Sequence, residues 1–236
     1  MIDSRRTATV TGVFFLVAAF PAMAALALYQ PVLGDGSYVL GTGSDAGIRL
    51  GAFLEILVAV SVAGTAITLY PVLRHRHSGF ALGYVCGRLL EATLIVIGIL
   101  ALLAVLTLRD GVAGADDGAL VATGRALVAL HDWTFLFGPN VALGVNTVLL
   151  AWLLLRSGLV PRWIPALGLV AGPLIFVSAT AVLAGLYDQV SLPGTLAALP
   201  VFAWEMSLAV YLVARGFRGA VPASTPAVER GAPVPA

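Results

Sequence analysis

The chain has 236 residues, of which 60% are hydrophobic and only 11% are charged, and its formal net charge is +1. A water-soluble domain carries roughly 25% charged residues, so this composition excludes a soluble globular protein. The small net charge excludes a general basic field for nucleic acid. A single cysteine, Cys86, excludes an intrachain disulfide and any metal site built from several cysteines. The composition therefore predicts an integral membrane protein.

Six apolar segments are long enough to cross the lipid bilayer as helices, which takes about 20 residues each. They are residues 8–29, 50–73, 80–108, a segment ending at Leu155, 163–186 and 196–213. We therefore predict an all-α fold, a polytopic transmembrane helical bundle of six spans, in one integral-membrane domain over residues 1–216. Residues 217–236 have no helical pattern and are expected to form a disordered cytoplasmic tail.

The arginines that flank these segments indicate how the chain is oriented. One side of the predicted membrane collects eight of them, namely Arg5, Arg6, Arg74, Arg76, Arg156, Arg162, Arg215 and Arg218. The main cations of the opposite side are Arg49 and Arg109. Because cytoplasmic loops carry the excess of basic residues, we expect a multi-pass protein of the cell inner (plasma) membrane with both termini in the cytoplasm.

The first segment has a second interpretation. Arg5 and Arg6, followed by an apolar run and an A-x-A sequence at 22–24, are similar to a cleaved twin-arginine signal. The apolar run is too long for a usual signal, and five further spans follow. We therefore favour a first transmembrane helix.

The stretch from Ala119 to Gly138 is apolar enough to suggest a seventh span. An independent crossing would move the later arginines to the other side and remove their asymmetry. Arg125 and Asp132, seven residues apart, share one face of a helix. We interpret the stretch as an outer amphipathic or re-entrant helix that ends at a break at Pro139.

Four ionisable residues lie inside the predicted spans: Glu55, Arg88, Glu91 and Glu205. A charge at mid-bilayer costs about 2.5–3.5 kcal/mol on insertion scales, so these side chains are expected to face the bundle interior. Arg88 and Glu91 share a helical face, and a planar guanidinium can bind further carboxylates. The group is either a structural ion-pair network or a ligand or proton site. Three carboxyls against one guanidinium leave at least one acid that should be protonated, and depth in the membrane favours Glu205.

Weaker candidates for a ligand or proton site lie toward the outer end of the fourth span: Arg125, His131, Asp132 and Asn140. A His–Asp pair can hold a proton, but a zinc site needs three or four convergent ligands, so we predict no metal site. Interfacial anchoring by Trp133 is the alternative explanation of this cluster. Asn140 and Asn146 are expected to form interhelical hydrogen bonds. The chain has no phosphate-binding loop, dinucleotide fingerprint or hydrolase motif, so no cofactor is expected.

Two small-residue motifs, Gly83-x-x-x-Gly87 and Gly168-x-x-x-Gly172, permit close approach between helices. We expect them to pack within one chain, with a homodimer through these faces as the alternative. Cys86 lies inside a span and is expected to be buried as a small hydrophobic residue.

Several segments are characteristic in detail: LYPVL (69–73), ALGYVCGRLLEA (81–92), LFGPN (136–140), RSGLVPRWIPALGLVAG (156–172) and LPVFAWEMSLAVYLVARGF (199–217). In these segments the chain resembles a widespread bacterial membrane family known as domain of unknown function 4386. The resemblance implies a small multi-span inner-membrane protein without an established activity. It places Arg88, Glu91 and Glu205 inside family-like motifs and implies no substrate.

Three functions are compatible with these features. One is an integral inner-membrane protein that binds or moves a small molecule through a polar pocket of Glu55, Arg88, Glu91 and Glu205. Another is an intramembrane enzyme in which one carboxyl serves as general acid and a partner as base. The third is a non-catalytic helper protein, in which the charges only set the register of the helices. The sequence leaves open whether the protein is an enzyme.

Overall fold

The computed structural model describes residues 4–41, 44–111 and 116–218. Six helices within these residues are long and apolar enough to cross a membrane. Their bounds are α1 Ser4–Gly34, α2 Ala46–Leu73, α3 Ser78–Gly111, α4 Asp117–Leu136 with its continuation α5 Leu143–Ser157, α6 Trp163–Leu183 and α7 Leu192–Arg215. The predicted all-α bundle of six spans is confirmed. Nearly all of the predicted tail, from residue 219 on, lies outside the described residues.

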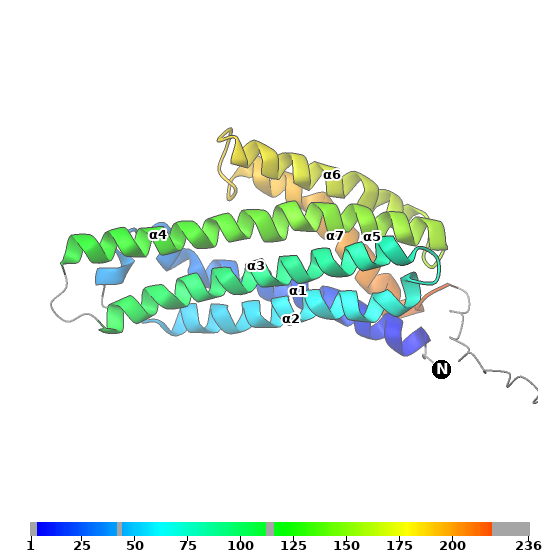
Figure 1. Cartoon of the computed structure of the whole chain (residues 1–236), viewed down its shortest axis with the longest axis horizontal. Helices are drawn as coiled ribbons and strands as arrows, with labels where there is room; N and C mark the ends of the chain where they lie inside the picture. The colour runs from blue at the N-terminus through cyan, green and yellow to red at the C-terminus, as the bar shows by residue number, and fades with distance from the viewer. Residues whose placement is uncertain (1–3, 42–43, 112–115, 219–236) are drawn as a thin grey trace, which may run out of the picture.

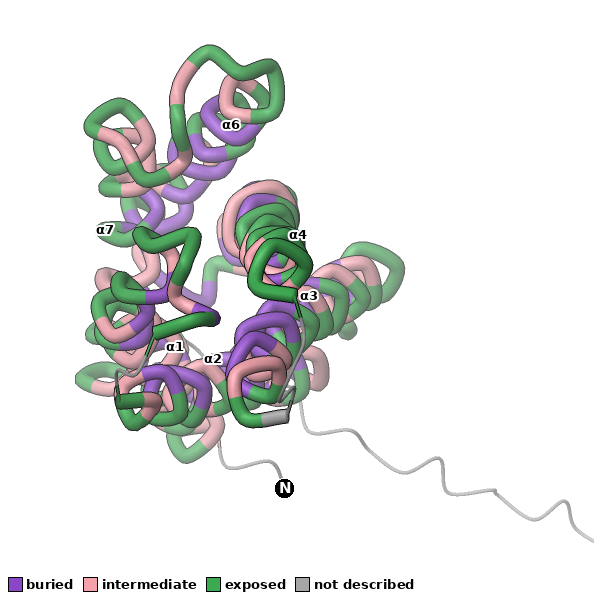
Figure 2. The backbone as a smooth tube through the Cα atoms, turned by 90° about the vertical axis from the view of Figure 1, so that its left-hand side faces the viewer, coloured by how far each residue is buried: buried purple, intermediate pink, exposed green. Residues whose placement is uncertain are grey.

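The helices follow one another around a closed ring. α1 packs on α2, α2 on α3, α3 on α4 and α5, α5 on α6, α6 on α7, and α7 returns to α1 (Figures 1 and 2). The start of α1, the end of α7 and the α2–α3 and α5–α6 connections lie at one end, which we call the terminal end. The other connections point toward the opposite, distal end. The eight flanking arginines therefore gather at the terminal end, as the sequence predicts.

The outer surface of the ring is apolar. Phe53, Ile67 and Val170 are more than half exposed, and a surface of this kind marks contact with lipid. Cys86 also lies on this surface, so the expectation that its thiol is buried is wrong. Two residues correspond to about 200° around a helix, and Arg88 therefore faces the interior while Cys86 faces outward.

Glycines bring the helices close together inside the ring. A β-carbon at Gly168 would collide with the indole of Trp204 on α7, and one at Gly87 would collide with the amide of Asn146 on α5. A β-carbon at Gly172 would likewise collide with the side chain of Val148 and with the backbone of α5. Residues of both small-residue motifs thus face neighbouring helices of the same chain, where a larger side chain would force the helices apart.

The segment from 117 to 157 is one helix of 41 residues. α4 passes into α5 through a π-helical segment, η2 (Phe137–Ala142), which contains Pro139. The stretch 119–138 is therefore not a seventh span, but the expected break at Pro139 is wrong, because the helix continues through it. Pro139 has no amide proton for the carbonyl of Phe135, and the Asn140 side chain donates to that carbonyl instead, at 3.1 Å.

At the distal end, the α4–α5 helix is longer than is needed to cross a bilayer. At 1.5 Å per residue the α4–α5 helix is about 60 Å long, whereas the hydrocarbon core is about 30 Å thick. A second apolar cluster holds the distal parts of α1, α2, α3 and α4 together; its buried members include Val32, Val39, Ile48, Leu102 and Leu106. Arg109 of α3 closes this end by pairing with Asp45 and donating to the carbonyl of Gly41 at 2.6 Å.

Candidate functional site

Arg88 on α3 is the centre of a buried ion-pair network. Its Nη1 donates to both carboxylate oxygens of Glu91, at 3.0 and 3.1 Å, and its Nη2 donates to Glu205 Oε1 at 3.0 Å. The side chains of Arg88, Glu91 and Glu205 are only 3%, 4% and 13% exposed. Since Glu205 belongs to α7, the guanidinium joins two helices across the interior of the ring. The structure thus brings together three of the four ionisable residues that the sequence places inside spans.

Further polar contacts hold this network in place. Arg88 Nε donates to the Tyr84 hydroxyl at 3.1 Å, and the Tyr84 hydroxyl lies 3.3 Å from that of Thr65 on α2. Asn146 of α5 donates to Glu91 Oε2 at 2.8 Å, which is the interhelical bond expected of it. Tyr84 is not among the residues predicted for the site, although its position four residues before Arg88 places the two side chains on one face of the helix.

Glu55 is separate from this network. The Tyr29 hydroxyl of α1 donates to Glu55 Oε2 at 3.0 Å, and no arginine among the described residues forms an ion pair with Glu55. Depth in the membrane favours Glu205 as the excess acid, but Glu205 is paired with Arg88. The acid without a guanidinium partner is Glu55, because the arrangement of the helices decides which carboxyl the guanidinium reaches.

A partly open pocket of about 200 Å³ between the helices connects Glu55 with the Arg88 network. We call it the inner cavity. Its wall carries all four ionisable residues of the spans together with His131 of α4. The remainder of the wall is mostly small or apolar, with Ala18, Ala22, Val58, Val62, Ile95, Ala198 and Val201 among its residues. Glu55 therefore faces the same space as the Arg88 network without touching it.

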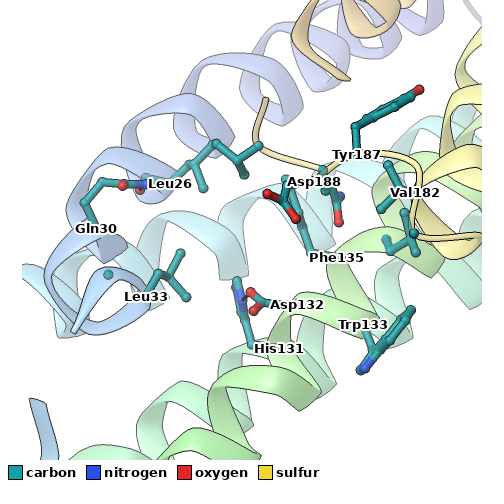
Figure 3. A pocket seen from close by; sticks show the side chains of 15 residues that line it. Leu26, Gln30, Leu33, His131, Asp132, Trp133, Phe135, Val182, Tyr187 and Asp188 are labelled. Atoms are coloured by element: carbon teal, nitrogen blue, oxygen red, sulfur yellow. Dashed lines mark hydrogen bonds and ion pairs between the residues drawn. The ribbon is translucent and has the colours of Figure 1, made fainter. Parts of the chain in front are cut away.

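A larger pocket of about 790 Å³, which we call the vestibule, lies between α1, α4 and the α6–α7 connection (Figure 3). Leu26, His131 and Phe135 line both the vestibule and the inner cavity. The two spaces therefore adjoin at these three side chains. Asp132 of α4 and Asp188 of the α6–α7 connection are the acidic residues of the vestibule wall.

His131 lies at the junction of the two spaces. Its side chain is only 4% exposed, its ring packs edge-on against Tyr29 with 5.7 Å between centroids, and it stacks on Phe135 at 6.2 Å. Its Nδ1 is 3.4 Å from Asp132 Oδ1. The neighbouring Trp133 is half exposed, as an interfacial anchor would be. His131 itself is part of the site rather than of that anchor.

Arg125 and Asn140 line neither the inner cavity nor the vestibule. Arg125 is exposed and lines a distal pocket of about 180 Å³ with Asp35 and with Asp132, which also lines the vestibule. In that pocket the pKa of Asp35 is held below its ordinary value, because the hydroxyl and the amide of Ser37 donate to its carboxylate. Asn140 bonds to its own helix, so the expectation that it joins two helices is wrong.

The structure also bears on metal binding. Among residues 4–41, 44–111 and 116–218, no group of three His, Cys, Asp or Glu side chains converges in a way that could hold a metal ion. Structural zinc needs four such ligands and catalytic zinc needs three. The ionisable and polar groups that line the inner cavity are carboxyl, guanidinium, phenol and imidazole groups.

An apolar ring of six helices around a charged interior defines an integral, multi-pass membrane protein. The chain belongs to the family described as Domain of unknown function (DUF4386), whose match covers residues 10–216 and hence almost the whole ring. The resemblance noted in the sequence is thereby confirmed. No curated protein and no solved structure matches the chain. Any function must therefore be argued from the site.

Proposed function

We propose that this protein binds a small molecule in the inner cavity and admits it through the vestibule. The observation that carries the proposal is a cavity of about 200 Å³ whose wall holds Glu55, Arg88, Glu91 and Glu205. Ionisable groups inside a membrane are costly, and they mark substrate or proton pathways. A network that only linked helices would need no adjoining space, since protein interiors are otherwise close-packed.

The orientation of the protein follows from its arginines. We propose that the terminal end faces the cytoplasm of a bacterial inner membrane, because it collects the eight flanking arginines. The distal connections instead carry acidic residues, among them Asp35, Asp45, Asp110, Asp116 and Asp188. In this orientation the vestibule opens on the outer side of the membrane.

An intramembrane enzyme is the second candidate function. It is favoured by the arrangement of Glu55, Tyr29 and His131 around one cavity, since a carboxyl, a phenol and an imidazole can act as general acid and base. An enzyme would convert its substrate in detergent without any gradient, whereas a binding or transport protein would release its ligand unchanged. A non-catalytic helper would keep its cellular role when the inner cavity is filled.

Access to the inner cavity is tested with single cysteines in a Cys86→Ala background. Ala22→Cys and Ala198→Cys place a thiol in the wall of the inner cavity. In purified protein in detergent, we expect both thiols to react readily with a small methanethiosulfonate, because the vestibule admits the reagent with its water. The measured quantity is the rate of modification, followed by mass spectrometry.

Two control positions make this measurement specific. Ala66→Cys is fully buried and lines neither space, and Ile67→Cys lies on the outer apolar surface. Neither should react readily, since the first is enclosed and the second sits in detergent, where a thiolate is disfavoured. Equal rates at the cavity positions and the controls would show that the inner cavity does not admit small molecules, and the proposed function would then be wrong.

A further inference from the structure

We infer that the ligand of the inner cavity is a small organic cation, a protonated amine with an apolar body about the size of one ring, whose ammonium group lies against Glu55. This inference rests on the proposed function and names the class of ligand. It follows from the charges along the route, from the partners that those charges already have, and from the size and lining of the inner cavity.

The charges that line the route are predominantly negative. The wall of the inner cavity holds three carboxyls, Glu55, Glu91 and Glu205, and one guanidinium, Arg88. The vestibule is lined by Asp132 and Asp188, and no arginine is among the described residues of its wall (Figure 3). Walls of one sign raise the local concentration of the opposite charge. Both spaces therefore favour a cation.

The partners of these groups decide where the cation binds. Arg88 is already paired with Glu91 and Glu205, each at 3.0 Å. An anion could reach the guanidinium only by displacing one of these buried carboxylates, which would leave that carboxylate uncompensated. Glu55 instead has only the neutral phenol of Tyr29 as its hydrogen-bond partner among the described residues. An ammonium group at Glu55 adds a cationic hydrogen-bond donor that no arginine among the described residues supplies, beside the imidazole of His131, which interacts electrostatically with this carboxyl.

His131 is the other titratable group that faces this position, from α4. Its Nδ1 is directed to Asp132, at 3.4 Å, on the vestibule side. The ring packs edge-on against Tyr29, the residue that donates to Glu55. His131 therefore separates the acidic group of the vestibule from Glu55 and forms the boundary that an incoming cation passes.

The size and lining of the inner cavity define the rest of the ligand. A dry cavity of about 150 Å³ lined by apolar side chains binds benzene, so about 200 Å³ accommodates one ring with a short ammonium arm. Beyond Glu55 the wall is apolar, with Ala18, Val58 and Val62, and Phe202 adds an aromatic ring of the kind that attracts cations. A hard divalent ion fits poorly here, since calcium takes six to eight oxygen ligands.

The test compares three probes of similar shape and different charge. Binding of benzylammonium, benzyl alcohol and benzoate to the purified full chain in detergent is measured by calorimetry. We expect benzylammonium to bind about tenfold or more tightly than benzyl alcohol, the ratio that one charge-assisted hydrogen bond supplies. Benzoate should not bind. Equal affinity for the alcohol and the ammonium, or no binding of the ammonium, would overturn the inference.

Substitutions at Glu55 assign the effect to this carboxyl. Glu55→Gln keeps the size of the side chain and an acceptor for Tyr29, and it should reduce the affinity for benzylammonium to that for benzyl alcohol. Glu55→Asp keeps the charge and should retain a preference for the ammonium. The matched control is Asp110→Asn, which removes an exposed carboxylate that lines neither space and should change nothing. A preference that survives Glu55→Gln would overturn the assignment to Glu55.

The two proposals fail in different ways. If the cavity cysteines react readily and the neutral probe binds as well as the ammonium, the inner cavity is a binding site but its ligand is not a cation. If the cavity cysteines react no faster than their controls, the proposed function fails first, and the inference fails with it.

Discussion

Arg88 shows how a buried charge depends on its partners. Its guanidinium donates to Glu91, Glu205 and Tyr84, and its Cζ atom lies over the Phe15 ring, 5.5 Å from the ring centre. Removing one partner of a buried ion pair costs about 3–5 kcal/mol, because the other charge is left uncompensated. Replacing the whole pair by apolar groups is often nearly neutral. The network therefore stabilises the helices only while it is complete.

The effects of substitutions in the network are therefore expected not to be additive. Arg88→Met should lower the free energy of unfolding by about 3–5 kcal/mol, and Glu91→Gln should lower it by a smaller amount. The double variant should lose less than the sum of the two, because Glu91→Gln removes one of the carboxylates that Arg88→Met leaves unpaired. Thermal unfolding in detergent measures all three variants.

The control for this cycle is an exposed ion pair of the same chemistry. Arg49 and Asp110 lie 3.7 Å apart with side chains 60% and 67% exposed. Arg49→Met should cost no more than about 1 kcal/mol, as is usual for exposed pairs. Strict additivity of the Arg88 and Glu91 effects would contradict the claim that the two are energetically coupled.

At the scale of the element, the continuity of α4 and α5 depends on which group donates a hydrogen bond to the carbonyl of Phe135. Pro139 cannot donate to the carbonyl of Phe135, and the side-chain amide of Asn140 does so at 3.1 Å. Short π-helical segments are frequent at functional sites. Here η2 follows directly after the part of α4 that carries His131 and Phe135, so the same local distortion positions the boundary of the inner cavity.

The role of Asn140 can be tested by a second cycle. Asn140→Ala should destabilise the protein by about 1 kcal/mol, because it leaves a partly buried carbonyl without this donor. In a Pro139→Ala background the residue 139 amide is available to that carbonyl, so the same Asn140→Ala change should cost much less. Unfolding in detergent measures both. An equal cost in the two backgrounds would contradict the proposed role of Asn140.

At the scale of the whole molecule, the vestibule arises from helices of unequal length. α6 and α7 have 21 and 24 residues, hence about 31 and 36 Å, whereas the α4–α5 helix of 41 residues is about 60 Å long. The α6–α7 connection therefore ends well before the tip of α4 (Figure 1). At the terminal end the ring is closed, since Arg5 of α1 donates to the carbonyls of Val213 and Ala214, at 3.0 and 3.1 Å.

The proposed orientation of the molecule predicts which positions an impermeant thiol reagent reaches in intact cells. In a Cys86→Ala background, cysteines at Asp45, Asp116 and Gln189 should be labelled from outside, because all three lie in distal connections. Cysteines at His75 and Ser157, at the terminal end, should not be labelled. Ser157 is preferable to Gly158, whose φ of 68° is unfavourable for any other residue.

Labelling at Ser157 would contradict the proposed topology, since it would place the end of α5 on the outer side. A control with permeabilised cells should label His75 and Ser157, which shows that both thiols are reactive once the reagent reaches them.

Some features of the site could be predicted because they depend on local spacing. Arg88 and Glu91 are three residues apart on one helix, so their pairing needs no knowledge of the neighbouring helices. The partner on α7 could be named as a candidate but not chosen, since Glu55 and Glu205 were equally available to the guanidinium. The Tyr29–Glu55 bond and the burial of His131 had no local signal, because each depends on contacts between helices that are distant in the sequence.

The sequence by itself determined the membrane class, the six apolar spans and the gathering of eight arginines at one end, because composition and length act on each segment separately. Only the tertiary structure decided that the chain continues as a helix through Pro139, that Cys86 faces outward, and that Glu205 rather than Glu55 reaches Arg88. The reason is physical. The periodicity of the sequence indicates which residues share a face of one helix. The rotation and height of each helix in the ring instead depend on close packing between glycines and large side chains of different helices, as at Gly168 and Trp204.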